Sequence, residues 1–183
     1  MNTECIRALK ANVDQGEALR AFSAPGFSAL YWRARRGPLQ RIADVYVPFR
    51  VYRVSYEARG STYARIFALD AVEGSLDLFA FAHVPSTEEL VSVTTRNHLK
   101  AALESSRAAS LLYEKVLRII FQQGFFKLRE PNLQLSPEPD PVHIPYWLAF
   151  YGRRMLRCRV LDAVRRQMEG AKARAFFEQW LAA

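Results

Sequence analysis

The sequence lacks the cysteine and histidine patterns that hold metal ions in proteins. Its 183 residues include two cysteines, Cys5 and Cys158, which lie far apart and form no C-x-x-C pair. None of the three histidines has a partner at ligand spacing, and no H-E-x-x-H run occurs. We therefore expect neither a metal site nor a bound cofactor.

Long apolar runs are also missing, as are the motifs of nucleotide binding and ester hydrolysis. No stretch approaches the 18 apolar residues of a membrane-spanning helix, and the first 20 residues lack the apolar core of a signal peptide. There is no glycine-rich phosphate loop and no G-x-S-x-G elbow. The sequence thus predicts a reduced, cytoplasmic protein without a membrane span, and it offers no catalytic residues.

What the sequence does have is apolar residues for a core and an excess of arginine. Half of the residues are hydrophobic, 13% are aromatic and the formal net charge is +8. Residues 31–65 hold eight basic and two acidic side chains, and residues 141–183 hold eight and three, whereas residues 66–140 are net acidic. A protein with such basic segments favours anionic partners.

Hydrophobic periodicity predicts a helix over residues 3–22 and a series of strands after it. Aromatic and β-branched residues, which strands prefer, dominate these later runs. The predicted strands cover residues 28–35, 45–56, 62–70 and 76–82. Ser86 and Glu89 form a capping-box pattern, and a long helix with an apolar face is expected over residues 97–123.

The C-terminal third begins with residues 130–141, which hold four of the nine prolines and predict an extended linker. Residues 144–151 and 155–162 predict a second hairpin, and residues 163–182 a final amphipathic helix. The sequence therefore predicts a single α+β domain with an antiparallel, twisted sheet built from two related β-hairpin units. An N-terminal helix, a long connecting helix and a C-terminal helix complete the expected fold.

Two segments share the same order of landmarks, which indicates an internal repeat. The first copy, residues 45–74, has the triplet Val-Pro-Phe at 47–49, and the second, residues 142–164, has Ile-Pro-Tyr at 144–146. Both copies then end in the tetrapeptide Leu-Asp-Ala-Val. The spacing from proline to aspartate is 22 residues in the first copy and 17 in the second, a difference that a hairpin turn absorbs.

This pattern resembles the "Pro-Tyr-Trp … Asp-Ala-Val-x-Gly" hairpins of uncharacterised bacterial proteins and is similar, more loosely, to PepSY-type modules. The second copy has Pro145, Tyr146 and Trp147 but lacks the closing glycine, whereas the first copy has Gly74 but carries Arg50 in place of tryptophan. The resemblance covers about a third of the chain. It implies a regulatory or inhibitory interaction role and carries over no catalytic residue.

The landmarks also have structural explanations. Asp70 can accept hydrogen bonds from backbone amides a few residues on and so close a turn, in which Gly74 supplies a positive φ. Asp162 precedes the final predicted helix and is expected to be its N-cap. An acid–base pair formed by Asp70 and Asp162 is the alternative that involves catalysis.

Arginines in the predicted strands are the candidate contacts with an anionic or protein partner, because a guanidinium binds phosphate and carboxylate and stacks on aromatic rings. Trp147 joins them as the position at which the two copies differ. The candidates are Arg50, Arg53, Arg65, Trp147, Arg157 and Arg159. The alternative is that these side chains form the solvent face of a one-sided sheet.

The leading hypothesis is a non-enzymatic protein-interaction or regulatory module of a bacterial cytoplasm, with self-association as one form of that role. An arginine-rich nucleic-acid-binding protein is the alternative, although no RNP, KH or helix-turn-helix motif accompanies the arginines. An enzyme that acts on an anionic substrate is the third hypothesis.

Overall fold

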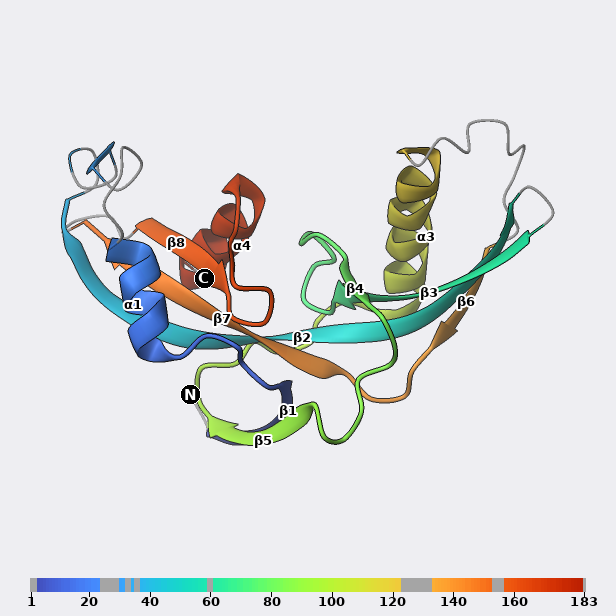
Figure 1. Cartoon of the computed structure of the whole chain (residues 1–183), viewed down its shortest axis with the longest axis horizontal. Coiled ribbons are helices and arrows are strands. Elements are labelled where there is room, and N and C mark those ends of the chain that lie inside the picture. Colours follow the sequence, from blue (N-terminus) through green and yellow to red (C-terminus); the bar gives the residue numbers. More distant parts are fainter. Residues whose placement is uncertain are drawn as a thin grey trace. The chain divides into compact units, whose positions relative to one another are not determined.

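The computed structural model of the chain describes residues 3–23, 30–31, 34, 37–58, 61–122, 133–152 and 157–182. Within these residues the protein is α+β, with three helices and a large, mixed, mostly antiparallel sheet (Figure 1). The chain divides into two compact units. Unit 1 spans Met1–Tyr46, Val91–His98 and Ile144–Ala183, and unit 2 spans Val47–Leu90 and Leu99–His143.

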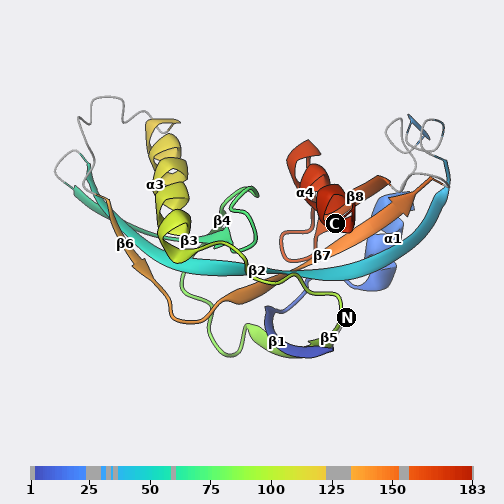
Figure 2. The ribbon, with the colours of Figure 1, turned by 180° about the vertical axis from the view of Figure 1, so that it is seen from behind.

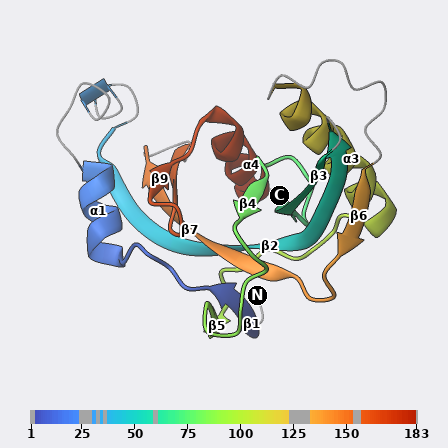
Figure 3. The ribbon, with the colours of Figure 1, turned by 45° about the vertical axis from the view of Figure 1, so that its right-hand side comes forward.

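Unit 1 contains two of the helices and the β7–β8 hairpin. Its elements are β1 (Glu4–Leu9), α1 (Gln15–Ser23), the first part of β2 (Leu39–Ala58), most of β5 (Leu90–Thr95), most of β7 (Val142–Tyr151), β8 (Arg157–Asp162), β9 (Gln167–Met168) and α4 (Ala171–Ala182). The strands follow the order β2-β7-β1-β5, with β8 antiparallel to β7 and β9 antiparallel to β8. In Figure 1, β8 lies between α1 and α4, and Figure 3 shows β9 between the same two helices.

The core of unit 1 is built on both faces of the β7–β8 hairpin. On one face, Phe22 of α1 belongs to a buried cluster with Tyr151 and Leu161. On the other face, α4 buries Phe176 and Phe177, and the ring of Phe177 meets that of Tyr146 edge-on at 5.5 Å between centroids. Alternate residues of a strand point to opposite faces, which is why adjacent positions of this hairpin serve two different helices.

Unit 2 contains the β2–β3 hairpin and one long helix. Its elements are the second part of β2, β3 (Ser61–Asp70), β4 (Phe79–Phe81), α3 (Ser105–Gln122) and β6 (Gln134–Pro137). The strand order is β4-β3-β2, and β6 also pairs antiparallel with β2. Figure 2 shows α3 rising beside β3 and β6.

The core of unit 2 lies between α3 and one face of its hairpin. Four helix residues at helical spacing are buried against the strands, namely Ala108, Leu112, Val116 and Ile120. The strand residues of the same cluster are Tyr52, Val54, Tyr56, Phe67 and Leu69. The regular four-residue spacing on α3 gives one continuous apolar stripe, as expected for a helix that covers a sheet.

The prediction of one helix over residues 3–22 is wrong in its first half, which forms β1. Ile6 and Ala8 are both buried and follow the two-residue period of a strand. The helix begins only after Asp14, whose carboxylate accepts a hydrogen bond from the Glu17 amide at 2.7 Å while Glu17 accepts one from the Asp14 amide at 3.0 Å. This reciprocal cap fixes the start of α1.

The predicted helix over residues 97–123 also begins later than expected, at Ser105. The amides of Ala102 and Leu103 donate to the carbonyl of Ala71 at 2.9 and 2.8 Å, so this stretch is bound to the hairpin rather than wound into the helix. Of the two hydrogen bonds of the Ser86–Glu89 pattern, one forms as expected: the Ser86 amide donates to the Glu89 carboxylate at 2.8 Å. The Glu89 amide donates instead to the backbone carbonyl of Ser86, at 3.1 Å. It leads into β5, whose sequence is rich in β-branched residues.

Three further boundaries differ from the prediction. Residues 134–137 of the expected linker form β6, which pairs with β2 because Leu135 packs against the unit 2 core. The expected final helix over 163–182 begins at Ala171, after a turn and the short strand β9. The predicted strand over 76–82 is limited to β4, and the predicted strand over 28–35 lies mostly outside the described residues.

Both predicted strand pairs form. β2 and β3 pair antiparallel from Phe49–Asp70 to Ala58–Ser61, and β7 and β8 pair from Tyr146–Asp162 to Tyr151–Arg157. In each hairpin the aromatic residue after the proline lies opposite the aspartate of the shared tetrapeptide. The hairpins therefore have the same register at this point.

Candidate functional site

Arg50 binds the segment that leads into α3. Its guanidinium donates to the Leu103 carbonyl at 2.8 Å and to the Ser105 hydroxyl. Arg50 lies opposite Leu69, on the same hairpin face as the buried Tyr52. These contacts join the start of α3 to β2, so Arg50 has a positioning role within unit 2.

Trp147 occupies the matching register position in the other hairpin, opposite Leu161. Its indole N–H donates to the Val13 carbonyl at 3.0 Å. Val13 lies two residues before α1, just as Leu103 lies two residues before α3. Arginine and tryptophan thus make the same kind of contact in the two units, from a strand to the carbonyl that precedes a helix.

The arginines of β8 are likewise engaged within unit 1. Arg157 forms an ion pair with Glu178 of α4 at 2.9 Å, and Glu178 also accepts the amide of Cys158 at 3.2 Å. Arg159 donates to the Phe22 carbonyl at 3.3 Å, and its guanidinium carbon lies 5.9 Å from the centroid of the Phe22 ring. Burial is the main reason that the pKa of the Cys158 thiol rises to about 12, which leaves this thiol unreactive at neutral pH.

Arg53 and Arg65 lie on opposite faces of the β2–β3 hairpin. Arg53 is opposite Ile66, and Arg65 is opposite Val54, one position along each strand. Arg53 forms an ion pair with Glu138. Arg65 has no hydrogen-bond or ion-pair partner in the described part of the chain.

Asp70 closes the turn after β3 with a fully buried carboxylate. One oxygen accepts the amides of Glu73 and Gly74 at 2.9 and 2.8 Å, and the other accepts the amide of Leu76 at 2.8 Å. Gly74 has φ of 71°, and a Cβ there would lie 2.7 Å from a methyl carbon of Leu111. Only glycine fits this position without strain.

Asp162 does not cap the last helix as expected, because α4 begins nine residues later and a turn into β9 intervenes. One carboxylate oxygen accepts the amides of Val164 and Arg165, both at 2.8 Å. The other oxygen is buried without a hydrogen bond and lies 3.5 Å from Nε of Arg165. Burial raises the pKa of this carboxyl above its ordinary value.

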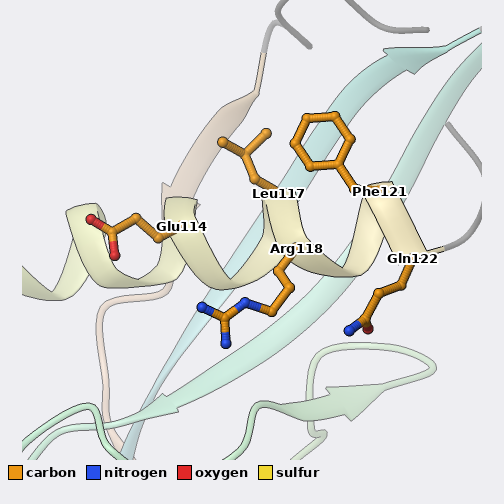
Figure 4. Close-up of a pocket in the computed structure, with 5 residues that line it drawn as sticks. All are labelled: Glu114, Leu117, Arg118, Phe121 and Gln122. Carbon is orange, nitrogen blue, oxygen red and sulfur yellow. The ribbon is translucent and has the colours of Figure 1, made fainter. Parts of the chain in front are cut away.

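A further surface, which the sequence-based candidates did not include, lies on the outer side of α3. Glu114, Leu117, Arg118, Phe121 and Gln122 line an open hollow of about 510 Å³. Figure 4 shows Leu117 and Phe121 projecting to one side of α3, and Arg118 and Gln122 to the other. With Tyr113, which is 37% exposed, Leu117 and Phe121 form an apolar row at four-residue spacing.

This outer row was available in the sequence. Tyr113, Leu117 and Phe121 each follow a residue of the buried row by one position, so the helix carries two adjacent apolar rows. A single row is enough to cover a sheet, and the second row widens the apolar face beyond what unit 2 buries. The prediction of one apolar face on this helix left the second row out.

The described residues include no group of three or more histidine, cysteine, aspartate or glutamate side chains that could hold a metal ion. In the same residues, no helix is long and apolar enough to cross a membrane.

The fold defines the class of this protein as α+β, with a mostly antiparallel sheet. No protein-family model, curated protein or solved structure matches the chain.

Proposed function

We propose that the chain is a non-enzymatic protein-interaction module that binds an amphipathic helix of a protein partner on the outer side of α3. The observation that carries this proposal is the row of Tyr113, Leu117 and Phe121. An apolar row at four-residue spacing on an exposed helix face is the surface that a second helix packs against. Aromatic side chains in such a row are also the usual anchors of a protein interface.

Charged groups beside the row support a helical protein partner rather than a lipid. Glu114 and Arg118 carry opposite charges and line the same hollow as Leu117 and Phe121. A surface with both signs of charge suits a partner helix with complementary charges, whereas binding to an anionic membrane surface favours a uniformly basic rim. The bacterial, regulatory role implied by the PepSY-like resemblance agrees with this proposal.

The alternative of nucleic-acid binding finds less support from the candidate arginines. Arg50, Arg53, Arg157 and Arg159 all have partners inside the protein. These contacts hold the guanidinium groups in place within the protein and use some of the N–H donors that a phosphate would bind. We retain a cytoplasmic location as part of the proposal, and the two unbridged cysteines are consistent with a reducing compartment.

We also propose that residues 45–74 and 142–164 are an internal repeat. Three matched features support it. The carbonyl of Pro48 accepts the amide of Ala71 at 2.8 Å, and that of Pro145 accepts the amide of Ala163 at 3.1 Å. Both hairpins place an aromatic residue opposite the aspartate. Four residues after each aspartate the backbone has a positive φ, at Gly74 and Arg166.

A helical peptide library provides the test of the interaction proposal. Displayed amphipathic helices would be selected against the whole protein, and the dissociation constants of the selected peptides would then be measured. Leu117→Asp and Phe121→Asp should each weaken binding about tenfold to a hundredfold, as expected for interface anchors. Leu181→Asp is the matched control, because Leu181 is an exposed leucine on α4.

Two outcomes would contradict the proposal. If the selected peptides bind both outer-face variants as tightly as the unchanged protein, the outer side of α3 is not the site. If no helix binds, but a labelled DNA or RNA strand binds with an affinity that falls steeply with salt, the nucleic-acid alternative replaces it.

A further inference from the structure

A second feature of unit 2 is a cavity on the inner side of α3, separate from the outer hollow. It has a volume of about 220 Å³. Apolar walls come from Phe67 of β3, Leu78 before β4, and Val116, Ile119 and Ile120 of α3. An engineered cavity of roughly 150 Å³ with similar lining holds benzene, so this cavity is large enough for a ring with a short substituent.

The rest of the lining is Ala80 of β4 and two polar side chains, Tyr56 of β2 and Arg65 of β3. Neither the Tyr56 hydroxyl nor the Arg65 guanidinium has a hydrogen-bond partner in the described residues. The Tyr56 ring is held by stacking on Tyr63, at 5.3 Å between centroids. The cavity therefore combines apolar walls with one available cation and one available hydroxyl.

Arg65 also borders a neighbouring hollow of about 390 Å³, which Arg53 lines as well. Arg65 is the only residue that lines both spaces among the described residues. Its position is one residue before the stretch of β3 that β4 covers, since β4 pairs only with Ile66, Phe67 and Ala68. The guanidinium thus stands where the apolar cavity meets a more polar, open space.

Arg157 is the arginine of unit 1 that corresponds to Arg65, and it shows how such a side chain binds a nearby carboxylate. Arg65 precedes Asp70 by five residues, and Arg157 precedes Asp162 by five. Arg157 pairs with the Glu178 carboxylate at 2.9 Å, whereas Arg65 has no acidic partner among the described residues. Arg157 thus has a carboxylate partner within the protein, whereas for Arg65 a bound ligand would have to supply the carboxylate.

We propose that this cavity binds a small amphiphilic carboxylate. Its ring or branched chain of roughly six to ten carbon atoms occupies the apolar cavity. Its carboxylate accepts hydrogen bonds from the Arg65 guanidinium and the Tyr56 hydroxyl. The ligand lies on the inner side of α3, so this inference is independent of the interaction proposed for the outer side.

A carboxylate fits these donors better than a phosphate does. It has a single charge and two oxygens, which one guanidinium can bind through two parallel hydrogen bonds. A phosphate ester presents more charge and three acceptor oxygens, and binding it usually takes several cations or a row of backbone amides. Among the described residues, the cavity has one arginine and no other basic lining residue.

Titration of the whole protein with benzoate and 3-phenylpropionate tests the proposal, with amide shifts followed by NMR. We expect saturable shifts around Tyr56, Phe67 and Ile119, while benzyl alcohol, the uncharged counterpart, binds about tenfold or more weakly. Acetate, which lacks the apolar part, should not saturate in the same range. Arg65→Gln should weaken benzoate binding by about tenfold or more.

Matched variants separate the cavity from general effects. Arg53→Gln removes the other arginine of the neighbouring hollow and should leave benzoate binding unchanged. Ala80→Trp, at an exposed residue that lines the cavity, should fill the space and abolish binding while the fold is retained. The proposal is overturned if neither acid binds below about 10 mM, a weak limit for ligands of this size. Benzyl alcohol binding as tightly as benzoate, or unchanged affinity in Arg65→Gln, would overturn it equally.

Discussion

The β2–β3 and β7–β8 hairpins end in the same tetrapeptide, yet their buried aspartates are satisfied to different degrees. Asp70 accepts three backbone amides with its two oxygens, whereas Asp162 accepts two with one oxygen and leaves the other without a hydrogen bond. The difference comes from the length of the loop after each aspartate. The chain after Asp70 makes a longer loop that brings in Leu76, while the chain after Asp162 turns directly into β9. A shared motif therefore sets the first contacts, and loop length sets the rest.

The largest expected difference is between alanine variants of the two aspartates. Asp70→Ala leaves three buried or part-buried amides without acceptors and should lower the free energy of unfolding by about 4 kcal/mol. Asp162→Ala removes two such bonds but also an unsatisfied buried oxygen, so we expect a loss of about 2 kcal/mol. Urea denaturation of both variants measures the difference. Equal losses would show that the third amide of the Asp70 turn adds nothing.

Arg50, which follows Phe49, and Trp147, which follows Tyr146, give the second comparison. Arg50→Met removes two hydrogen bonds from a charged donor, and we expect a loss of about 2 kcal/mol. Trp147→Phe removes one neutral hydrogen bond and should cost about 1 kcal/mol. Hydrogen exchange should speed up at the start of α3 in the first variant and of α1 in the second. Faster exchange spread evenly through either unit would contradict the local role of these contacts.

The strands of both hairpins were predictable because aromatic and β-branched residues mark them and their pairing partners come soon after them in sequence. Helix starts were less predictable. Leu99 and Leu103 lie in the helix predicted over residues 97–123 and are buried, as its apolar face requires. Their segment is not helical, because the amides of Ala102 and Leu103 bind the Ala71 carbonyl about thirty residues away. Hydrophobic periodicity correctly identified the buried positions of this segment. It could not predict which carbonyl the backbone amides of the segment would bind.

The candidate arginines show that sequence patterns are equally limited in predicting a binding site. The sequence indicates that Arg157 and Arg65 are strand residues with matching places, but the ion pair with Glu178 depends on where α4 packs. Whether an arginine is available to a ligand is thus decided by tertiary contacts. The outer row of α3 could be found from spacing alone, since Leu117 and Phe121 are one helical turn apart. The inner cavity could not, because its walls come from separate strands and a helix.

Substitutions at the positive-φ residues that follow the two aspartates give the third comparison. Gly74→Ala should cost about 2 kcal/mol, since the added Cβ lies 2.7 Å from a Leu111 methyl and φ is 71°. Arg166→Gly, at φ of 59°, should leave stability unchanged or raise it by about 0.5 to 1 kcal/mol, because glycine adopts this conformation without a steric penalty. Thermal denaturation of both variants measures the two effects, and a destabilised Arg166→Gly protein would mean that the arginine side chain supports the turn.

The smallest expected effect is the pH dependence of stability that the Asp162 carboxyl contributes. Because burial raises its folded pKa above the ordinary value of 3.8, the folded protein binds more protons than the unfolded chain between the two pKa values. The stability that this group contributes is therefore greatest at low pH and falls as pH rises through the folded pKa.

Asp162→Asn keeps an oxygen acceptor for the amides of Val164 and Arg165 and removes the titration. The stability of Asp162→Asn relative to the unchanged protein should thus increase as pH rises from below about 4 and then level off. Urea denaturation across this pH range measures the difference, in which the other titrating groups largely cancel, and a difference that decreases with pH would mean that the turn amides and Arg165 outweigh burial.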